Sequence, residues 1–304
     1  MRAVVAVLIA CGLAAADQTS VTSNGITWTF AEARPCGTFC TGDPWVLAPV
    51  TIVAITTDLH DPGFTPGLGQ DGSMLTPGVD SHQGYDDRLT SYRAERNAAL
   101  IDGERISAAK PLAIAEPASL VSMVSWLYRS ETDAEPGIPR FNGGTKAPRP
   151  VTRSGAILTI LAAEPPADSF RPPYSGPQRA PTHRLADLDL GRLPRLAAVA
   201  DHPDAARLAA RLRGPWIDHV WEYLGAMVHP SQNMPNYGRD MAKIIVDAAL
   251  LLLIEPEAMG GEDAHRNLAI PLVQFGIDCA GIADAGGGWQ ANGGHHTGRK
   301  LPIL

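Results

Sequence analysis

The hydrophobic pattern changes near residue 193, and this change limits the possible folds more than any other feature of the chain. Before it, apolar segments are short and rich in β-branched and aromatic residues, as in strands. After it, apolar residues recur every three or four positions, the spacing of amphipathic helices. The sequence therefore predicts a β-rich domain followed by an α-helical one. The strand candidates are residues 26–30, 45–55, 118–128 and 156–161, and the helix candidates are residues 204–213, 216–228, 237–254 and 262–283.

Turn signals between the strand candidates favour an antiparallel β-sandwich. Stretches such as Asp61-Pro62-Gly63 separate the apolar runs, as in domains built from many short strands. Pro49 lies inside one run and indicates an edge strand or a bulge, because proline has no N–H for the ladder. Residues 67–93 are long for a loop, and we expect them to cover one face of the sheet.

The helical half predicts part of a larger α-domain that resembles an (α/α)-toroid. Residues 237–254 carry apolar side chains on both sides, so we expect a helix buried in nearly every direction. The last residues, 301–304, read as the start of another helix, which predicts that the domain is incomplete at its C-terminus. The predicted division is a signal peptide (1–16), a β-sandwich-like domain (17–175), a Pro-rich linker (176–193) and a helical domain (194–304).

The N-terminus predicts export. Arg2, an apolar run over residues 3–13 and Ala14-Ala15-Ala16 follow the order of a secretory signal peptide, with cleavage after Ala16. A lipoprotein signal at Cys11 is the alternative. The mature protein would be secreted or periplasmic. We expect no membrane span, because residues 244–254 are too short to cross a bilayer.

Charge and cysteine content narrow the classes of partner. A net charge of −7 argues against a nucleic-acid binder, which needs a basic face. A disulfide between Cys36 and Cys40 would suit an exported protein, although the sequence leaves the bonding open. Cys279 stands alone in a helical pattern, and we expect it to be a small buried residue.

Two polar loops form the predicted functional site. Residues 286–300 combine many glycines with polar side chains, and residues 229–239 form a second polar loop. Glycine allows the backbone to approach a ligand closely. The helices between the loops should run out and back, so both loops should share one rim. The predicted catalytic residues are Tyr237, Arg239, His295 and His296, and the predicted substrate-binding residues are Asn236, Trp289, Gln290, Asn292 and Arg299.

A β-domain, a proline linker and helices with polar loops together resemble exported polysaccharide-degrading proteins with an (α/α)-toroid, namely the alginate lyase and heparinase-type lyases. Residues 25–30, 233–239 and 293–300 are also similar to long exported proteins of environmental bacteria that have no assigned function. The resemblance implies a secreted carbohydrate-active protein, and a lyase acting on an acidic (uronate) polysaccharide is the favoured activity.

Lyase chemistry assigns a role to each predicted residue. An elimination needs groups that neutralise the uronate carboxylate, a base that takes the C5 proton and an acid at the leaving oxygen. Asn236, Asn292 and Arg239 fit the first role, and Tyr237 or one of the two histidines fits the others. We expect no cofactor.

Other activities stay open at the level of the sequence. A glycoside hydrolase would need two facing carboxylates, and nothing in the spacing selects a pair. A non-catalytic carbohydrate-binding or scaffold protein needs no group with a shifted pKa. The candidate carboxylates for hydrolysis are Asp218, Glu222, Asp240 and Asp284.

Two clusters that contain histidine could instead bind a metal ion. His295 or His296 with His229 and Asp284 would make one site, but no short spacing enforces it. Asp58, His60 and Asp61 form the other cluster, which reads as a solvated turn. We therefore expect no metal.

Overall fold

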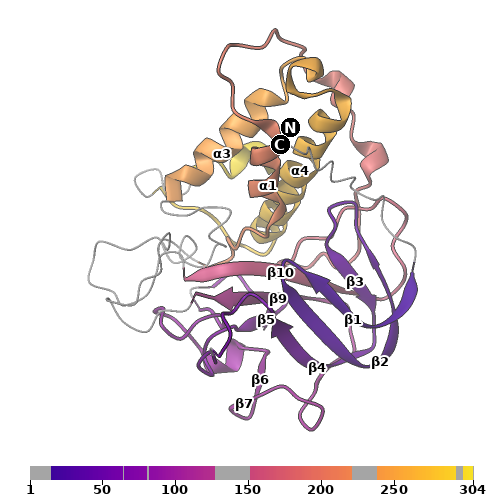
Figure 1. The fold of residues 1–304 in the computed structure, drawn as a ribbon, viewed down its shortest axis with the longest axis vertical. Helices are drawn as coiled ribbons and strands as arrows, with labels where there is room; N and C mark the ends of the chain where they lie inside the picture. The colour runs from indigo at the N-terminus through magenta and orange to yellow at the C-terminus, as the bar shows by residue number, and fades with distance from the viewer. Residues whose placement is uncertain are drawn as a thin grey trace.

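A computed structural model describes residues 15–63, 65–80, 82–126, 151–220, 238–291 and 297–303. It shows one curled mixed sheet with a layer of helices against one face (Figure 1). Among the described residues, the strands lie between residues 16 and 161 and the α-helices begin at residue 205.

The main sheet has eight strands and curls into a half-barrel (Figure 1). Its path is β5-β9-β10-β3-β2-β4-β8, and β1 pairs with β2 beside that path. The strands β6 (Leu100–Ile101) and β7 (Glu104–Arg105) form a separate pair. The bounds of the main strands are β1 (Ala16–Ser23), β2 (Ile26–Thr38), β3 (Pro44–Leu47), β4 (Val50–Thr57), β5 (Ser73–Leu75), β8 (Leu112–Ile114), β9 (Ala118–Ser125) and β10 (Thr152–Leu161).

The predicted antiparallel sandwich is wrong, because β3 pairs with β10 in parallel. The predicted strand over residues 45–55 divides at Pro49 into β3 and β4, which lie on opposite sides of β2. A proline cannot donate to the ladder, so it favours such a break. A single strand over residues 45–55 could have paired with only one side of β2. Because the chain breaks at Pro49, β3 pairs with one side of β2 and β4 with the other, so that β10 and β8 belong to the same sheet.

The two central strands, β9 and β10, are buried on both faces. Leu120 and Leu158 face the concave core, which also contains Trp28. Val121 and Ile157 point the other way, into a cluster that includes residues from the helical layer. Burial on both faces explains why these strands read as continuous apolar runs in the sequence.

In the described residues, the longer helices α1, α3 and α4 form the layer next to β10 (Figure 1). Asp204 begins α1 by accepting a hydrogen bond from the backbone N–H of Arg207 at 2.7 Å, a typical N-cap. The helix α4 runs through Pro271 without ending there. The bounds are α1 (Ala205–Arg213), α3 (Gly238–Leu251), α4 (Glu262–Asp284) and the short α5 (Lys300–Ile303); the 3-10 turns are η1 (Ala94–Arg96), η2 (Leu185–Asp187), η3 (Leu190–Arg192) and η4 (Pro256–Met259).

The predicted (α/α)-toroid is also wrong: the described helices make one layer on a sheet and not a ring of helix pairs. The buried apolar side chains of this layer pack on one another and against the outer face of the sheet. The predicted all-round burial of residues 237–254 fails for the same reason, since Val246 and Leu250 in α3 are 44% and 58% exposed. Residues 216–220, predicted to begin a helix, are not helical, and residues 221–228 lie outside the described residues.

Neighbouring leucines in α3 provide a matched test of this one-sided packing. Leu251 is 3% exposed and belongs to the helical core, whereas Leu250 points to solvent. We expect Leu251→Ala to lower the free energy of unfolding by about 2–5 kcal/mol. Leu250→Ala should change it by about 0.5 kcal/mol or less. Urea denaturation of both variants measures the difference, and equal losses would contradict the packing of α3.

Cys36, Cys40 and Cys279 are buried, and none of the three forms a disulfide. Cys36 lies in the concave core of the sheet, and Cys40 packs in a different cluster with Phe170 and Ile270. The considered disulfide between Cys36 and Cys40 is therefore absent. Burial, with a further contribution from the charge of Asp17, raises the pKa of the Cys36 thiol to about 11.

This raised pKa predicts how Cys36 reacts with alkylating agents. Only the thiolate is nucleophilic, and at pH 8 the folded protein holds Cys36 almost entirely as the thiol. We expect iodoacetamide to leave Cys36 unmodified in the folded protein at pH 8 and to modify it after unfolding in urea. Peptide mass spectrometry reads both states. Rapid modification of Cys36 without unfolding would contradict its burial.

The predicted signal peptide falls almost wholly outside the described residues. Ala16 is the first residue of β1 and pairs with Cys36 of β2. Export and cleavage after Ala16 stay predictions. Within the described part of the chain, no helix has the length and apolar character needed to cross a bilayer.

Candidate functional site

Most of the predicted catalytic residues cannot be placed. Tyr237, Asn236, Asn292, His295 and His296 lie outside the described residues. The backbone of Arg239 lies in the first turn of α3, but its side chain is also outside the description. The proposed roles of these six residues stay predictions.

The three remaining predicted residues have different surroundings. Arg299 is 4% exposed, and its Nε and Nη2 donate to the two carboxylate oxygens of Asp218 at 2.7 and 2.9 Å. Burial alone would lower the pKa of Arg299, but the charge of Asp218 and its hydrogen bonds raise it above the usual value. Trp289 is half-buried against both layers, and Gln290 is exposed. In the described structure Arg299 is therefore a buried partner of Asp218, and its role in binding a substrate stays a prediction.

The described ends of the two predicted loops do come together. Gly298 has a φ of +91°, and a Cβ at this position would lie 2.8 Å from the Cα of Ala242. Ala242 is in the first turns of α3, directly after the first loop. This contact is compatible with a shared rim, but the loops themselves lie largely outside the described residues, so the shared site stays a prediction.

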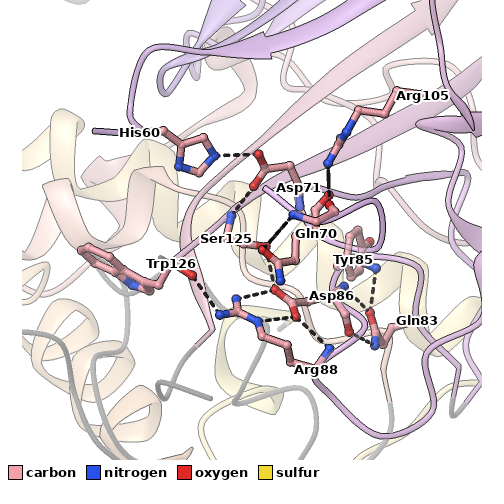
Figure 2. Close-up of polar contacts among 11 residues, drawn as sticks. His60, Gln70, Asp71, Gln83, Tyr85, Asp86, Arg88, Arg105, Ser125 and Trp126 are labelled. Carbon is pink, nitrogen blue, oxygen red and sulfur yellow. Dashed lines mark hydrogen bonds and ion pairs between the residues drawn. The ribbon is translucent and has the colours of Figure 1, made fainter. Parts of the chain in front are cut away.

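A polar network joins two loops to the end of β9 (Figure 2). His60 Nε2 lies 2.6 Å from Asp71 Oδ2, and the other oxygen of Asp71 accepts from the backbone N–H of Ser125 at 2.7 Å. The hydroxyl of Ser125 accepts from the backbone N–H of Asp71 at 3.1 Å and donates to Asp86 at 2.6 Å. Ser125 therefore links the loop that carries Asp71 to the turn that carries Asp86.

Arg88 forms an ion pair with the carboxylate of Asp86. The guanidinium donates to both carboxylate oxygens of Asp86, at 2.7 and 2.8 Å, and to the carbonyl of Trp126 at 2.9 Å. Gln83 closes the same turn by accepting from the N–H groups of Tyr85 and Asp86. Both carboxylate oxygens of Asp86 and the side-chain oxygen of Gln83 thus have partners inside the network, and these bonds fix the turn against the sheet.

This network anchors the long loop and does not present a nucleophile. The sequence grouped His60 with Asp58 and Asp61, whereas the structure pairs it with Asp71, which lies eleven residues further along the chain. The spacing could not show this pair, because the intervening loop folds back on itself. In the described ranges, no group of three His, Cys, Asp or Glu residues is arranged to hold a metal ion.

A second buried cluster joins the two layers. Arg171 donates to Asp43 at 3.0 Å and to both oxygens of Asp278 at 2.9 and 2.6 Å. Asp43 precedes β3, and Asp278 lies in α4. A pocket beside this triad has a volume of about 20 Å³, enough for roughly one water molecule. The cluster therefore has a structural role and has no room for an organic substrate.

A larger, open groove lies where the linker meets α4. Its volume is about 470 Å³, within the range of small-molecule sites. Leucines and charged side chains of both signs line it. The leucines are Leu185, Leu188 and Leu190, and the charged residues are Asp168, Asp189, Arg195, Glu262 and Arg266.

The leucines hold the linker in place and so shape the groove. Leu188 and Leu190 pack against the helical core, and Leu185 packs against the cluster around Phe170. The backbone N–H of Leu185 donates to the carbonyl of Asp168 at 2.8 Å. Because each leucine is buried on one side, η2 and η3 are held against the helical layer. The polar residues that lie between the leucines stay at the surface.

Some charged side chains of the groove can still form hydrogen bonds with a ligand. Arg195 pairs with Glu262 at 3.0 Å, whereas the one ion pair of Arg266 with the described residues, to Asp263, is 3.7 Å long. The carboxylate of Asp168 makes no hydrogen bond or ion pair with any described residue. Reading residues 176–193 as a plain linker missed this site. The recurrence of leucines with aspartates between them was the available signal.

Comparison with known proteins identifies no relative of this chain. No family model, no curated protein and no solved structure matches the chain, so the likeness to toroid lyases stays a prediction from the sequence and the groove is interpreted from its own residues.

Proposed function

We propose that this protein is a non-catalytic carbohydrate-binding protein and that the groove between the linker and α4 holds the sugar. The observation that carries the proposal is the open groove of about 470 Å³, which is lined by leucines together with carboxylates and guanidinium groups. Export, predicted from residues 1–16, is part of the same proposal.

The lining matches the surface of a sugar ring. A pyranose has C–H faces that pack on apolar side chains, and hydroxyl groups that both donate and accept hydrogen bonds. Carboxylates only accept, and guanidinium groups only donate. Asp168 and Arg266 supply these two complementary functions, and Leu188 and Leu190 supply apolar surface. Ligand pockets commonly combine apolar lining with a few polar groups that orient the ligand.

The state of the polar clusters supports binding over catalysis. A hydrolase needs two available carboxylates. Asp218, one of the candidates, accepts hydrogen bonds from Nε and Nη2 of Arg299 through its two oxygens. Glu222 and the side chain of Asp240 lie outside the described residues, and Asp284 is an exposed residue at the end of α4. The described residues contain no (α/α)-toroid of the kind on which the lyase expectation rested.

Calorimetric titration with neutral and acidic oligosaccharides tests the proposal. We expect saturable binding of at least one sugar, with no new unsaturated uronate absorbance and no new reducing ends. Elimination products would support the lyase interpretation, and reducing ends would support a hydrolase. Either product, or the absence of binding by every sugar, would overturn the proposed function.

A further inference from the structure

We infer that the groove selects neutral sugars over uronates, with Asp168 as the residue that determines this preference. The inference rests on the proposed function and deepens it, because it names the class of sugar. It also reverses the expectation of an acidic polysaccharide, which came from the loop at residues 286–300.

The charge of the groove is the first argument. Asp168, Asp189 and Glu262 contribute three carboxylates to the lining, against the two guanidinium groups of Arg195 and Arg266. The lining therefore has a net charge of −1. A uronate that enters the groove brings another negative charge into this field, whereas a neutral sugar does not.

The pairing of these charges identifies where the repulsion arises. Glu262 is neutralised by Arg195 at 3.0 Å, and Asp189 is neutralised by Arg192 at 3.1 Å. Asp168 has no such partner among the described residues, and it is half-buried. Its carboxylate can accept a hydrogen bond from a sugar hydroxyl. A sugar carboxylate has no proton to donate at neutral pH, so the same position disfavours it.

The backbone at Asp168 adds a constraint on what can replace this residue. Its φ is +59°, in the left-handed region. Asparagine and aspartate adopt this region more readily than other non-glycine residues. Asp168→Asn therefore removes the charge and preserves the backbone, which makes it a suitable test of the electrostatic argument.

A pair of sugars that differ only at C6 measures the selectivity. We expect galactobiose to bind the wild-type protein about threefold to tenfold more tightly than digalacturonate at low ionic strength, because of one like-charge contact near the protein surface. The difference should shrink as salt is added. In Asp168→Asn, the affinity for digalacturonate should rise and the preference should largely disappear.

Asp201→Asn is the matched control. Asp201 has the same φ of +59° but is absent from the groove lining, so this substitution should leave the preference unchanged. Equal or tighter binding of digalacturonate by the wild type would overturn the inference, as would an unchanged preference in Asp168→Asn. Failure of both sugars, and of the wider panel, would overturn the proposed function itself.

Discussion

Replacing Arg171 with methionine should lower the free energy of unfolding by about 3–5 kcal/mol, the usual result of removing one partner from a buried ion pair. The side chain of Arg171 is 2% exposed and holds one carboxylate from the sheet side, Asp43, and one from α4, Asp278. Methionine retains much of the apolar stem, so the loss would report the two carboxylates that are left buried without a counter-charge.

The same variant should have a distinctive dependence on pH. Burial raises the pKa of Asp278, and Arg171 opposes this effect. Without Arg171, the pKa of Asp278 in the folded state should rise further above its unfolded value. The folded state would then bind protons more tightly than the unfolded state, so the stability of the variant should increase as pH falls below neutral.

Urea denaturation at pH 7 and pH 5 measures both effects. Arg192→Met is the matched control, because Arg192 pairs with Asp189 at the surface of the same chain segment, where an ion pair contributes about 1 kcal/mol or less. A loss of less than 1 kcal/mol for Arg171→Met, or no recovery at pH 5, would contradict the role of the triad in joining the layers.

Replacing Arg266 with alanine should weaken the binding of a neutral oligosaccharide by about tenfold to a hundredfold. A hydrogen bond to a charged group contributes about 1.5–3 kcal/mol, and tenfold in affinity corresponds to about 1.4 kcal/mol. The side chain of Arg266 is 54% exposed, so the substitution should leave folding intact.

Calorimetric titration of Arg266→Ala against the wild type gives the size of this effect. Arg93→Ala removes an exposed arginine that is not part of the groove lining and pairs with none of its residues, and it should bind as the wild type does. Equal affinities for all three proteins would show that Arg266 does not contact the sugar.

The sequence predicted the local elements better than their assembly. Periodicity located the strand at residues 156–161 and the helix at residues 204–213, since local sterics and apolar spacing largely determine such segments. Which strands become neighbours depends on long-range pairing. The division at Pro49 decides whether β3 can reach β10, and nothing in the local pattern encodes that partner.

The candidate site illustrates the same limit. Arg299 carries a charge that suits a ligand, but the fold brings Asp218 to it from 81 residues away in the chain. Nothing in the sequence singled out Arg171, because its partners Asp43 and Asp278 lie 128 and 107 residues away in the chain. The groove was missed because a cavity arises only when the linker packs on α4.

Hydrogen–deuterium exchange with and without a bound neutral oligosaccharide tests the central claim most directly, because it locates the sugar. The groove predicts that the sugar slows amide exchange in residues 185–195 and in the first turn of α4, residues 262–266. Protection confined to residues 229–239 and 286–300 would contradict the groove and would assign the sugar to the two loops that the sequence predicted.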